Sequence, residues 1–538
     1  MAVFKNFVGQ AYTADSLAAD AQSTMNLYLE AVESGEGQNT NYLRLKPGLT
    51  LALTCATSPI RGIWIGEGRM FVVAGSKLIE VFSDNSQNVR GDVGNDGLPA
   101  QIFPNGNQIM VISALLAYVD NGAGPAAAVY SYGFAAVVNT AAAVFPAGNV
   151  VTWVSGNTFV GLVPGQRIVI TSVVYFILTV TSAASLVLYP IGDTGVQANA
   201  TATSTAAVAA SAGAVADGYY IAVTPSSKQV NSSALLNGLS WNPIDVAYKE
   251  GYPDNIQTIL WDHLDLWVFG SQTTEVWKDD AGVAFPFARD PGAYFPIGCA
   301  AINSPVKLAG GIAFLAGDTR GWVTAQRAAG YQLGRVSTHA IETAWSNYAT
   351  VSDAVSAVYL LEGHEHWVIT FPGANATWDY DATAASWTQR GWWNGSSNDR
   401  ERWMYHGFVF GQHYVGDWQT GNIYTMSSAV YQDNGVPIHW SRTAPWLNTE
   451  GLWSFFSELK LLMQAKIGDA VALNWAELNN DGSLSWHTAV SLTCAAAMRF
   501  IWRRLGKSQG GRVFQASGAA TGKVAIVSAF LTVEQGDE

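Results

Sequence analysis

Four polar residues in the segment LLEGHEHWVIT have the types and spacing that could bind a metal ion: Glu362, His364, Glu365 and His366. Histidines two positions apart share a face only where the chain is extended. Imidazole and carboxylate groups are ligands that Zn²⁺ accepts. The HExxH zinc motif, however, places both histidines on one helix, and this segment has no helical pattern. A polar hairpin turn is therefore the favoured interpretation, with the metal site as the alternative.

A second group, Asp262, His263 and Asp265 in WDHLDLW, supplies the acid and base types of a hydrolase triad. A triad also needs an activated nucleophile. No GxSxG motif lies near this segment. We therefore interpret these residues as part of a strand and turn.

The segment NNDGSLSW, with Asp481, Gly482 and Trp486, is similar to the Asp-box hairpin of sialidases. It is one incomplete copy, and Asp-Gly is a common hairpin turn. The sequence contains no GxGxxG, P-loop or EF-hand pattern. A glycosidase carboxylate pair depends on distances in the fold and stays open at this point. We predict no enzymatic activity and no catalytic, cofactor-binding or metal-binding residues.

The elements that carry these residues follow a repeating two-strand pattern, in which a run ending in an alternating apolar strand is followed by a turn and a second short strand. About six copies occur, with central strands that begin at Met70, Ile109, Leu266, Ile312, Trp367 and His413. Sheet units that recur at this period predict a β-propeller. The fold class is therefore all-β, with a propeller of six blades or nearly six.

The gap between Ile109 and Leu266 is longer than one blade, and residues 123–216 within it are rich in Ala, Val, Thr and Ser. A segment of this length is too long for a loop of a compact propeller. Ile168–Tyr189 has no charge and mimics a membrane span, but β-branched residues dominate it. We predict an inserted small β-barrel or sandwich, with a helix in lipid as the lesser alternative.

The predicted domain order places the propeller between two terminal parts. Residues 1–50 form an arm that contributes to the propeller, 51–122 and 217–430 form its blades, 123–216 form the insertion, and 431–538 form an antiparallel β-sandwich. The last part contains the basic cluster Arg499, Arg503, Arg504, Lys507 and Arg512. A solvated strand face is the favoured interpretation of this cluster, with an acidic partner or DNA as the alternative.

Composition limits the function further. The net charge is −13 and charged residues are only 13% of the chain. A protein that grips nucleic acid through its phosphates needs a basic face, whereas a surface so poor in charge indicates large protein interfaces. The three cysteines lie far apart in apolar contexts, as in a reduced cytosolic protein. The N-terminus lacks the pattern of a signal peptide.

The segment from Leu236 to Ile341 resembles the packaged-DNA stabilisation proteins of short-tailed phages, also called tail nozzle or tail hub proteins. The specific motifs are TTEVW at Thr273–Trp277 and STHAIE at Ser337–Glu342, and STMNLYLEAVESG near the N-terminus is also similar. The resemblance covers roughly 350 of the 538 residues, discontinuously. Residues 123–216 depart from the family pattern, so no role is carried over to them.

This resemblance implies a structural protein of the virion tail, made in the host bacterial cytoplasm. It implies a homohexameric channel below the portal and adaptor ring that retains packaged DNA and conducts it during ejection. The implied partners are the adaptor, tailspikes or tail fibres, and a needle or plug protein. No catalytic residue is carried over, and we interpret the motif residues Trp267, Glu275, Trp277, His339 and Glu342 as blade core and inter-blade hydrogen bonds. A carbohydrate-binding or glycan-degrading propeller of the virion is the alternative.

Overall fold

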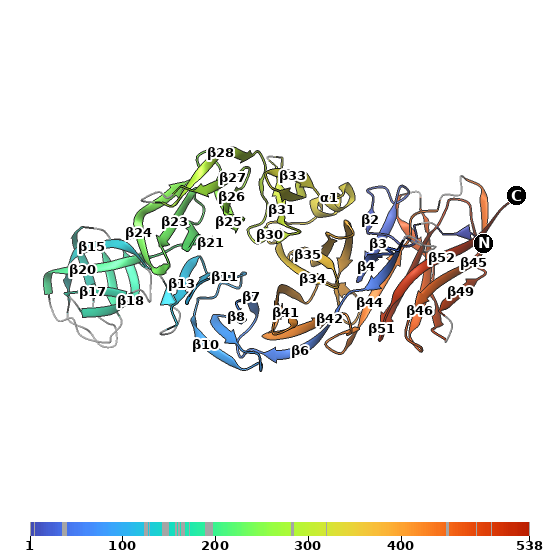
Figure 1. Cartoon of the computed structure of the whole chain (residues 1–538), viewed down its shortest axis with the longest axis horizontal. Helices are drawn as coiled ribbons and strands as arrows, with labels where there is room; N and C mark the ends of the chain where they lie inside the picture. The colour runs from blue at the N-terminus through green and yellow to red at the C-terminus, as the bar shows by residue number, and fades with distance from the viewer. Residues whose placement is uncertain are drawn as a thin grey trace. The chain divides into compact units, whose positions relative to one another are not determined.

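The computed structural model divides into two compact units, each described separately below (Figure 1). The first unit comprises Met1–Gly75, Ile79–Asn88 and Pro296–Glu538, and the second comprises Ser76–Leu78 and Val89–Phe295. The structure describes all residues except 1, 5, 35–39, 123–126, 129, 142–149, 157–158, 160–161, 163–166, 172, 189–196, 281–284, 319, 448–450, 480, 496–497 and 537–538.

The first unit contains four antiparallel sheets that match the repeat seen in the sequence. They are β7 (Ile60–Gly66), β8 (Arg69–Ala74), β9 (Lys77–Val81) and β10 (Gln87–Asp92), which lie mostly in this unit; β29 (Gly298–Cys299), β30 (Val306–Leu308), β31 (Gly311–Gly317), β32 (Val323–Ala329) and β33 (Gln332–Arg335); β34 (Val355–Leu361), β35 (His364–Phe371), β36 (Ala376–Asp381) and β37 (Ser386–Arg390); and β40 (Trp403–Val409), β41 (Gln412–Asp417) and β42 (Asn422–Ser427) with β6 (Gly48–Thr54).

The second unit contains three more sheets of this kind. They are β11 (Gln101–Asn105), β12 (Gln108–Ser113), β13 (Leu116–Asp120) and β14 (Ala127–Ala128); β21 (Ala212–Ala216), β22 (Tyr219–Val223), β23 (Gln229–Ala234) and β24 (Asn237–Tyr248); and β25 (Ile256–Asp262), β26 (Asp265–Gly270), β27 (Thr274–Asp279) and β28 (Phe287–Phe295). The prediction of an all-β propeller with nearly six blades is confirmed. The described residues hold seven such sheets. The sheet that the sequence pattern did not reveal is β21–β24, in which strands β21 (AGAVA) and β23 (QVNSSA) consist of small or polar residues.

Two features of the sequence explain these sheets. The central strands are continuous apolar runs because they are buried on both faces, and Met70–Ala74 of β8 are all fully buried. Two-residue turns with positive φ, such as His263–Leu264 and Glu362–Gly363, join neighbouring strands. Turns of this kind match the twist of a hairpin and set its register.

The last blade-like sheet takes its outer strand from the N-terminal arm. β6 pairs antiparallel with β42, with Leu49 opposite Met426 and Thr54 opposite Asn422. This sheet therefore combines two segments that are far apart in the sequence, β6 and β40–β42.

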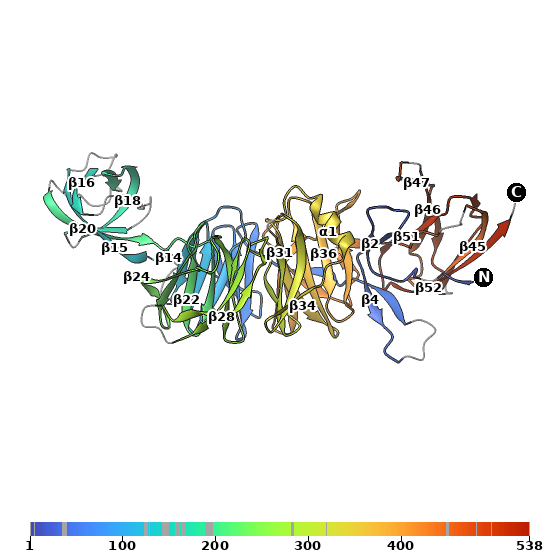
Figure 2. The same ribbon diagram turned by 90° about the horizontal axis from the view of Figure 1, so that it is seen from above.

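The inserted module is a closed β-barrel. Its strands follow the order β15 (Tyr130–Thr140), β16 (Val150–Gly156), β19 (Ser185–Leu188), β18 (Val173–Ser182), β17 (Arg167–Ile170) and β20 (Gln197–Ala207), and β20 pairs with β15 (Figure 2). Ile168, Ile170, Ile177, Leu186 and Leu188 fill its core. The uncharged segment noted in the sequence thus consists of barrel strands. Among the described residues, no helix has the length and apolar character needed to cross a membrane.

The C-terminal part is built from two packed groups of strands. One sheet contains β45 (Trp453–Gln464), β49 (Arg499–Arg503), β50 (Lys507–Ser508) and β52 (Ala525–Gly536), and the facing strands are β44 (Val436–Thr443), β46 (Ala470–Leu478), β47 (Leu484–Trp486), β48 (Val490–Thr493) and β51 (Val513–Ala520). The arm strands β1 (Ala2–Val3), β4 (Leu27–Ala31) and β5 (Asn41–Leu45) join the first sheet, so the two ends of the chain lie side by side (Figure 1). The arm therefore belongs to the sandwich as well as to the propeller.

Candidate functional site

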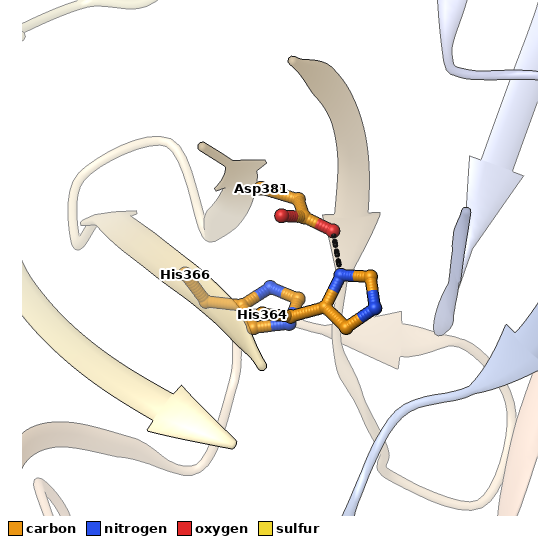
Figure 3. A group of neighbouring side chains, drawn as sticks. All are labelled: His364, His366 and Asp381. Carbon is orange, nitrogen blue, oxygen red and sulfur yellow. Dashed lines mark hydrogen bonds and ion pairs between the residues drawn. The ribbon is translucent and has the colours of Figure 1, made fainter. Parts of the chain in front are cut away.

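The His364–His366 segment lies at the start of β35, directly after the turn Glu362–Gly363, as the hairpin interpretation predicts. Both histidine side chains are buried on one face of the strand. Figure 3 shows His364 pointing its Nδ1 atom at Asp381 of the neighbouring strand β36, at 2.6 Å. The Nε2 atom of His364 lies 3.2 Å from a carboxylate oxygen of Glu30, on the arm strand β4. The side chain therefore bridges the blade and the arm.

A second and larger buried ionic network begins at His366, whose ring centroid lies 6.0 Å from that of His364. His366 contacts Asp379 at 3.0 Å, and Asp379 lies 3.4 Å from the guanidinium of Arg390. Arg390 also lies 3.4 Å from Glu401. The network is thus continuous through the interior of the first unit.

The other end of this network is formed around Lys46, which belongs to the arm. Its Nζ lies 2.7 Å from Glu401 and 3.0 Å from Asp433, and it donates to the carbonyl of Gly391 at 3.0 Å. The Lys46 side chain is 3% exposed and that of Glu401 is fully buried. The arm, the β34–β37 sheet and β43 (Gln432–Asp433) are therefore held together by charges removed from water.

The pKa values follow from these contacts. The hydrogen bond to Asp381 raises the pKa of His364 to about 9, against the lowering effect of burial. Burial raises the pKa of Asp433 to about 6, although Lys46 lowers it. Burial alone would also raise the pKa of Glu401, but Lys46 and Arg390 outweigh it, so that this pKa is lowered. The charged form of His364 is thus favoured at neutral pH.

His364, His366 and Asp381 are the group of described residues whose ligand atoms, within 4.8 Å of one another, could hold a metal ion. Binding would have to displace the proton shared by His364 and Asp381. His366 is also held by Asp379, which lies 3.4 Å from the guanidinium of Arg390. An ion-pair network is therefore the better account of this cluster.

The raised pKa of His364 predicts a pH-dependent stability. Because the folded value of about 9 lies above the ordinary value of 6.5, the stabilisation is fully present below pH 6.5 and is lost as the pH rises through 9. We expect His364 to contribute roughly 1–3 kcal/mol to the free energy of unfolding at low pH. Urea unfolding at about pH 6 and about pH 9.5 should show this loss in the wild type and a smaller loss in His364→Gln.

His339→Gln is the matched control for this measurement, because the His339 side chain is 73% exposed. It should keep the wild-type difference between the two pH values. Equal losses in His364→Gln and the wild type would contradict the assignment.

The motif residues of TTEVW lie in the interior of the second unit. Glu275 is fully buried and accepts hydrogen bonds from the indole of Trp277 at 2.9 Å and from the backbone of Gly251 at 2.8 Å. A Cβ atom at Gly251 would overlap the Glu275 carboxylate, so a larger residue there would force that side chain to move. Trp267 stacks on Phe295, with 5.5 Å between ring centroids. These residues hold one blade together.

Glu342 of STHAIE is the corresponding centre in the first unit. It lies in the first turn of α1 (His339–Ser346) and accepts from Arg335 at 2.6 and 2.8 Å and from the indole of Trp322 at 3.0 Å. The hydroxyl of Ser337 also donates to it. His339, by contrast, is exposed and stacks on Trp322. Four of the five motif residues are thus buried.

The other polar groups noted in the sequence do not converge. Asp262 and Asp265 face each other across the β25–β26 turn, and His263 contacts Asp262 at 2.6 Å. Asp481 accepts from the backbone of Ser483 at 2.9 Å in a surface turn. Both segments are hairpin turns.

The basic cluster of the C-terminal part divides into two. Arg512 is buried, donating to the carbonyl of Leu505 and to Glu477, each at 2.6 Å. Arg499, Arg503, Arg504 and Lys507 are exposed.

Sequence reasoning missed Lys46, Glu401, Asp433 and Lys249. Lys249 is fully buried and pairs with Asp254 and Thr273. A usable signal was the charge within aromatic strands, as in TWDYD, where Asp379 and Asp381 alternate with Trp378 and Tyr380 and all four are buried.

Comparison with known proteins adds the decisive observation. A family model described as Phage_stabilise, Bacteriophage P22 Gp10, beta-propeller, matches residues 148–431, which is more than half of the chain. The chain belongs to this family. The resemblance seen in the sequence is confirmed, and this Gp10-family protein is a structural component of a phage particle. The match includes residues 148–216, which the sequence analysis expected to depart from the family pattern, and it does not reach the N-terminal motif STMNLYLEAVESG.

No curated protein matches the Gp10-family chain. Similar solved structures include the N-terminal domain of Nup159, at 7% identity over 75% of this chain and 98% of that chain, with a TM-score of 0.37. Hsv2 of Kluyveromyces lactis shares 9% identity over 62% of this chain and 97% of that chain, with a TM-score of 0.23. PorZ, a surface component of the type-IX secretion system of Porphyromonas gingivalis, shares 10% identity over 98% and 82%, with a TM-score of 0.27. Likenesses at these scores carry no argument about function.

Proposed function

We propose that the protein is a tail nozzle subunit of a short-tailed phage. Six copies form a channel below the portal and adaptor ring, retain the packaged DNA and conduct it during ejection. The family match over residues 148–431 is the observation that supports this role. The proposed partners are the adaptor ring, tailspikes or tail fibres, and a needle or plug protein. DNA passes through the channel without specific binding.

The charge of the chain is compatible with a conduit for DNA. Six copies, at −13 each, carry about −78 formal charges. Duplex DNA carries about one negative charge per 1.7 Å of axis, and basic walls would hold it through counterion release. An acidic channel wall repels DNA instead, so that retention needs mechanical closure by loops or a plug protein.

Particles that carry the adaptor ring but lack this protein test the proposal. Adding the purified protein should produce sixfold density below the adaptor and should protect the packaged DNA from nuclease. Particles without the protein should lose DNA. Equal DNA retention in both kinds of particle, or density without sixfold symmetry, would contradict the proposal. A channel lined mainly by Lys and Arg would contradict the inference that the channel wall repels DNA.

A further inference from the structure

The outer face of the sheet formed by β49, β45 and β52 carries cations beside apolar side chains. Opposite residues in the register are Arg499 and Leu462, Ile501 and Lys460, Lys460 and Phe530, Arg503 and Glu458, and Lys507 and Phe455. The alternate residues of these strands, among them Leu459, Leu461, Phe500 and Trp502, fill the sandwich core. We call this surface the basic sheet face: Phe455, Lys460, Arg499, Ile501, Arg503, Lys507 and Phe530.

This face is accessible and partly apolar. The side chain of Arg503 is 66% exposed and contacts Glu458 of the neighbouring strand at 2.9 Å, and Phe455 is 39% exposed. The Lys507 ammonium lies 4.1 Å from the centre of the Trp453 ring, and that of Lys460 lies 5.6 Å from the Phe530 ring. Because lysines cover the rings, the surface is poorly suited to base stacking of a nucleic acid. A protein surface of acidic and apolar character fits it better.

The distribution of charge along the chain indicates where such a surface lies. Residues 431–538 contain nine basic and nine acidic residues, so the entire net charge of −13 belongs to residues 1–430. A second copy of the same chain therefore offers an acidic partner for the basic sheet face.

Within the second unit, acidic and apolar residues meet at neighbouring hairpin ends. Asp217 and Asp279 bring their carboxyl groups into hydrogen-bond contact, which raises the pKa of Asp217. The backbone of Leu236 donates to the carbonyl of Gly218 at 2.9 Å, next to Asp217. Leu235, Leu236 and Leu264 are 55%, 63% and 76% exposed. We call this surface the acidic hairpin face: Asp217, Leu235, Leu236, Leu264, Asp279 and Asp280.

A ring needs two different faces on each copy, because a heterologous contact joins one face of a subunit to another face of the next. The basic sheet face and the acidic hairpin face belong to different compact units of the chain and have opposite charge. Both also expose large apolar side chains, which supply the buried core of an interface.

We propose that the basic sheet face of one copy contacts the acidic hairpin face of the next copy in the ring. This inference rests on the proposed ring-forming function and names the contact that closes the ring. Charge reversal on one face places like charges opposite each other, so association should weaken at least about 100-fold.

The test uses two double variants of the full chain, Lys460→Glu with Arg499→Glu and Asp217→Lys with Asp279→Lys. Ring formation is measured by mass photometry of the purified protein and by images of adaptor-capped particles assembled from it. Each variant alone should lose the ring. A mixture of the two should restore it, because six positions allow the variants to alternate with complementary charges at every contact. A single chain with all four changes should also form rings, which shows that the variants fold.

Lys466→Glu with Lys523→Glu is the matched control, since both lysines are exposed in turns of the same sandwich. It should form rings as the wild type does. Rings that persist in either double variant, or a mixture that fails to restore them, would overturn the inference. If Lys460→Glu with Arg499→Glu keeps the ring but loses DNA retention, the face contacts nucleic acid and the inference is wrong. If the wild type forms no ring in solution and none on adaptor-capped particles, the proposed function itself is contradicted.

Discussion

Lys46→Ala is expected to lower the free energy of unfolding by roughly 3–5 kcal/mol. Removing one partner of a buried ion pair leaves an uncompensated charge away from water, and this costs more than the pair itself contributes. Here Glu401 and Asp433, fully buried and 3% exposed, would both lose their contact with the Lys46 ammonium. Thermal and urea unfolding, followed by tryptophan fluorescence, measure the loss.

Lys77→Ala is the matched control for Lys46→Ala. Lys77 also lies 2.8 Å from a carboxylate, that of Asp92, but the two side chains are 34% and 67% exposed. Exposed pairs contribute about 0–1 kcal/mol. A triple change, Lys46→Met with Glu401→Gln and Asp433→Asn, should recover part of the lost stability, since it removes the charges of these three residues while Arg390 keeps its contact with Asp379. A Lys46→Ala variant as stable as Lys77→Ala would contradict the importance of this network.

This network shows what sequence reasoning could not reach. Lys46 and Glu401 are 355 residues apart, and neither belongs to a motif whose spacing predicts the contact. The pairing arises because the arm strands β4 and β5 join the C-terminal sheet, which brings Lys46 back to the last blades. A long-range strand exchange of this kind leaves no periodic signal.

Local patterns were more informative. The alternation and turn chemistry around Glu362–Gly363 predicted the hairpin that presents His364, and the β-branched run from Ile168 to Tyr189 predicted strands. Both patterns are local, because each can be recognised within one short segment of the sequence. The sheet β21–β24 was missed because the strands on either side of its apolar strand YYIAV, which are AGAVA and QVNSSA, consist of small or polar residues.

The motif residue Glu342 carries the second large expected effect. Glu342→Ala should lower the free energy of unfolding by roughly 2–4 kcal/mol, because each buried donor left without an acceptor costs about 1–3 kcal/mol. The donors are the guanidinium of Arg335, the hydroxyl of Ser337 and the indole of Trp322. Part of the cost for Arg335 and Trp322 is recovered from water, since the Arg335 side chain is 47% exposed and Trp322 is 37% exposed. The expected loss is therefore smaller than for Lys46→Ala.

His339→Ala, in the same helix turn, separates this structural role from a surface role. Its side chain is 73% exposed and its nearest contact with Glu342 is 4.0 Å, so its removal should change stability by less than about 0.5 kcal/mol. Glu342→Gln keeps the shape of the side chain but loses the charge, and it should lie between the two. If His339→Ala and Glu342→Ala were equally mild in urea unfolding while only His339→Ala impaired assembly, STHAIE would be a contact surface. Because Glu342 is buried and accepts hydrogen bonds from three donors, we expect Glu342→Ala to lower the stability and His339→Ala to leave it unchanged.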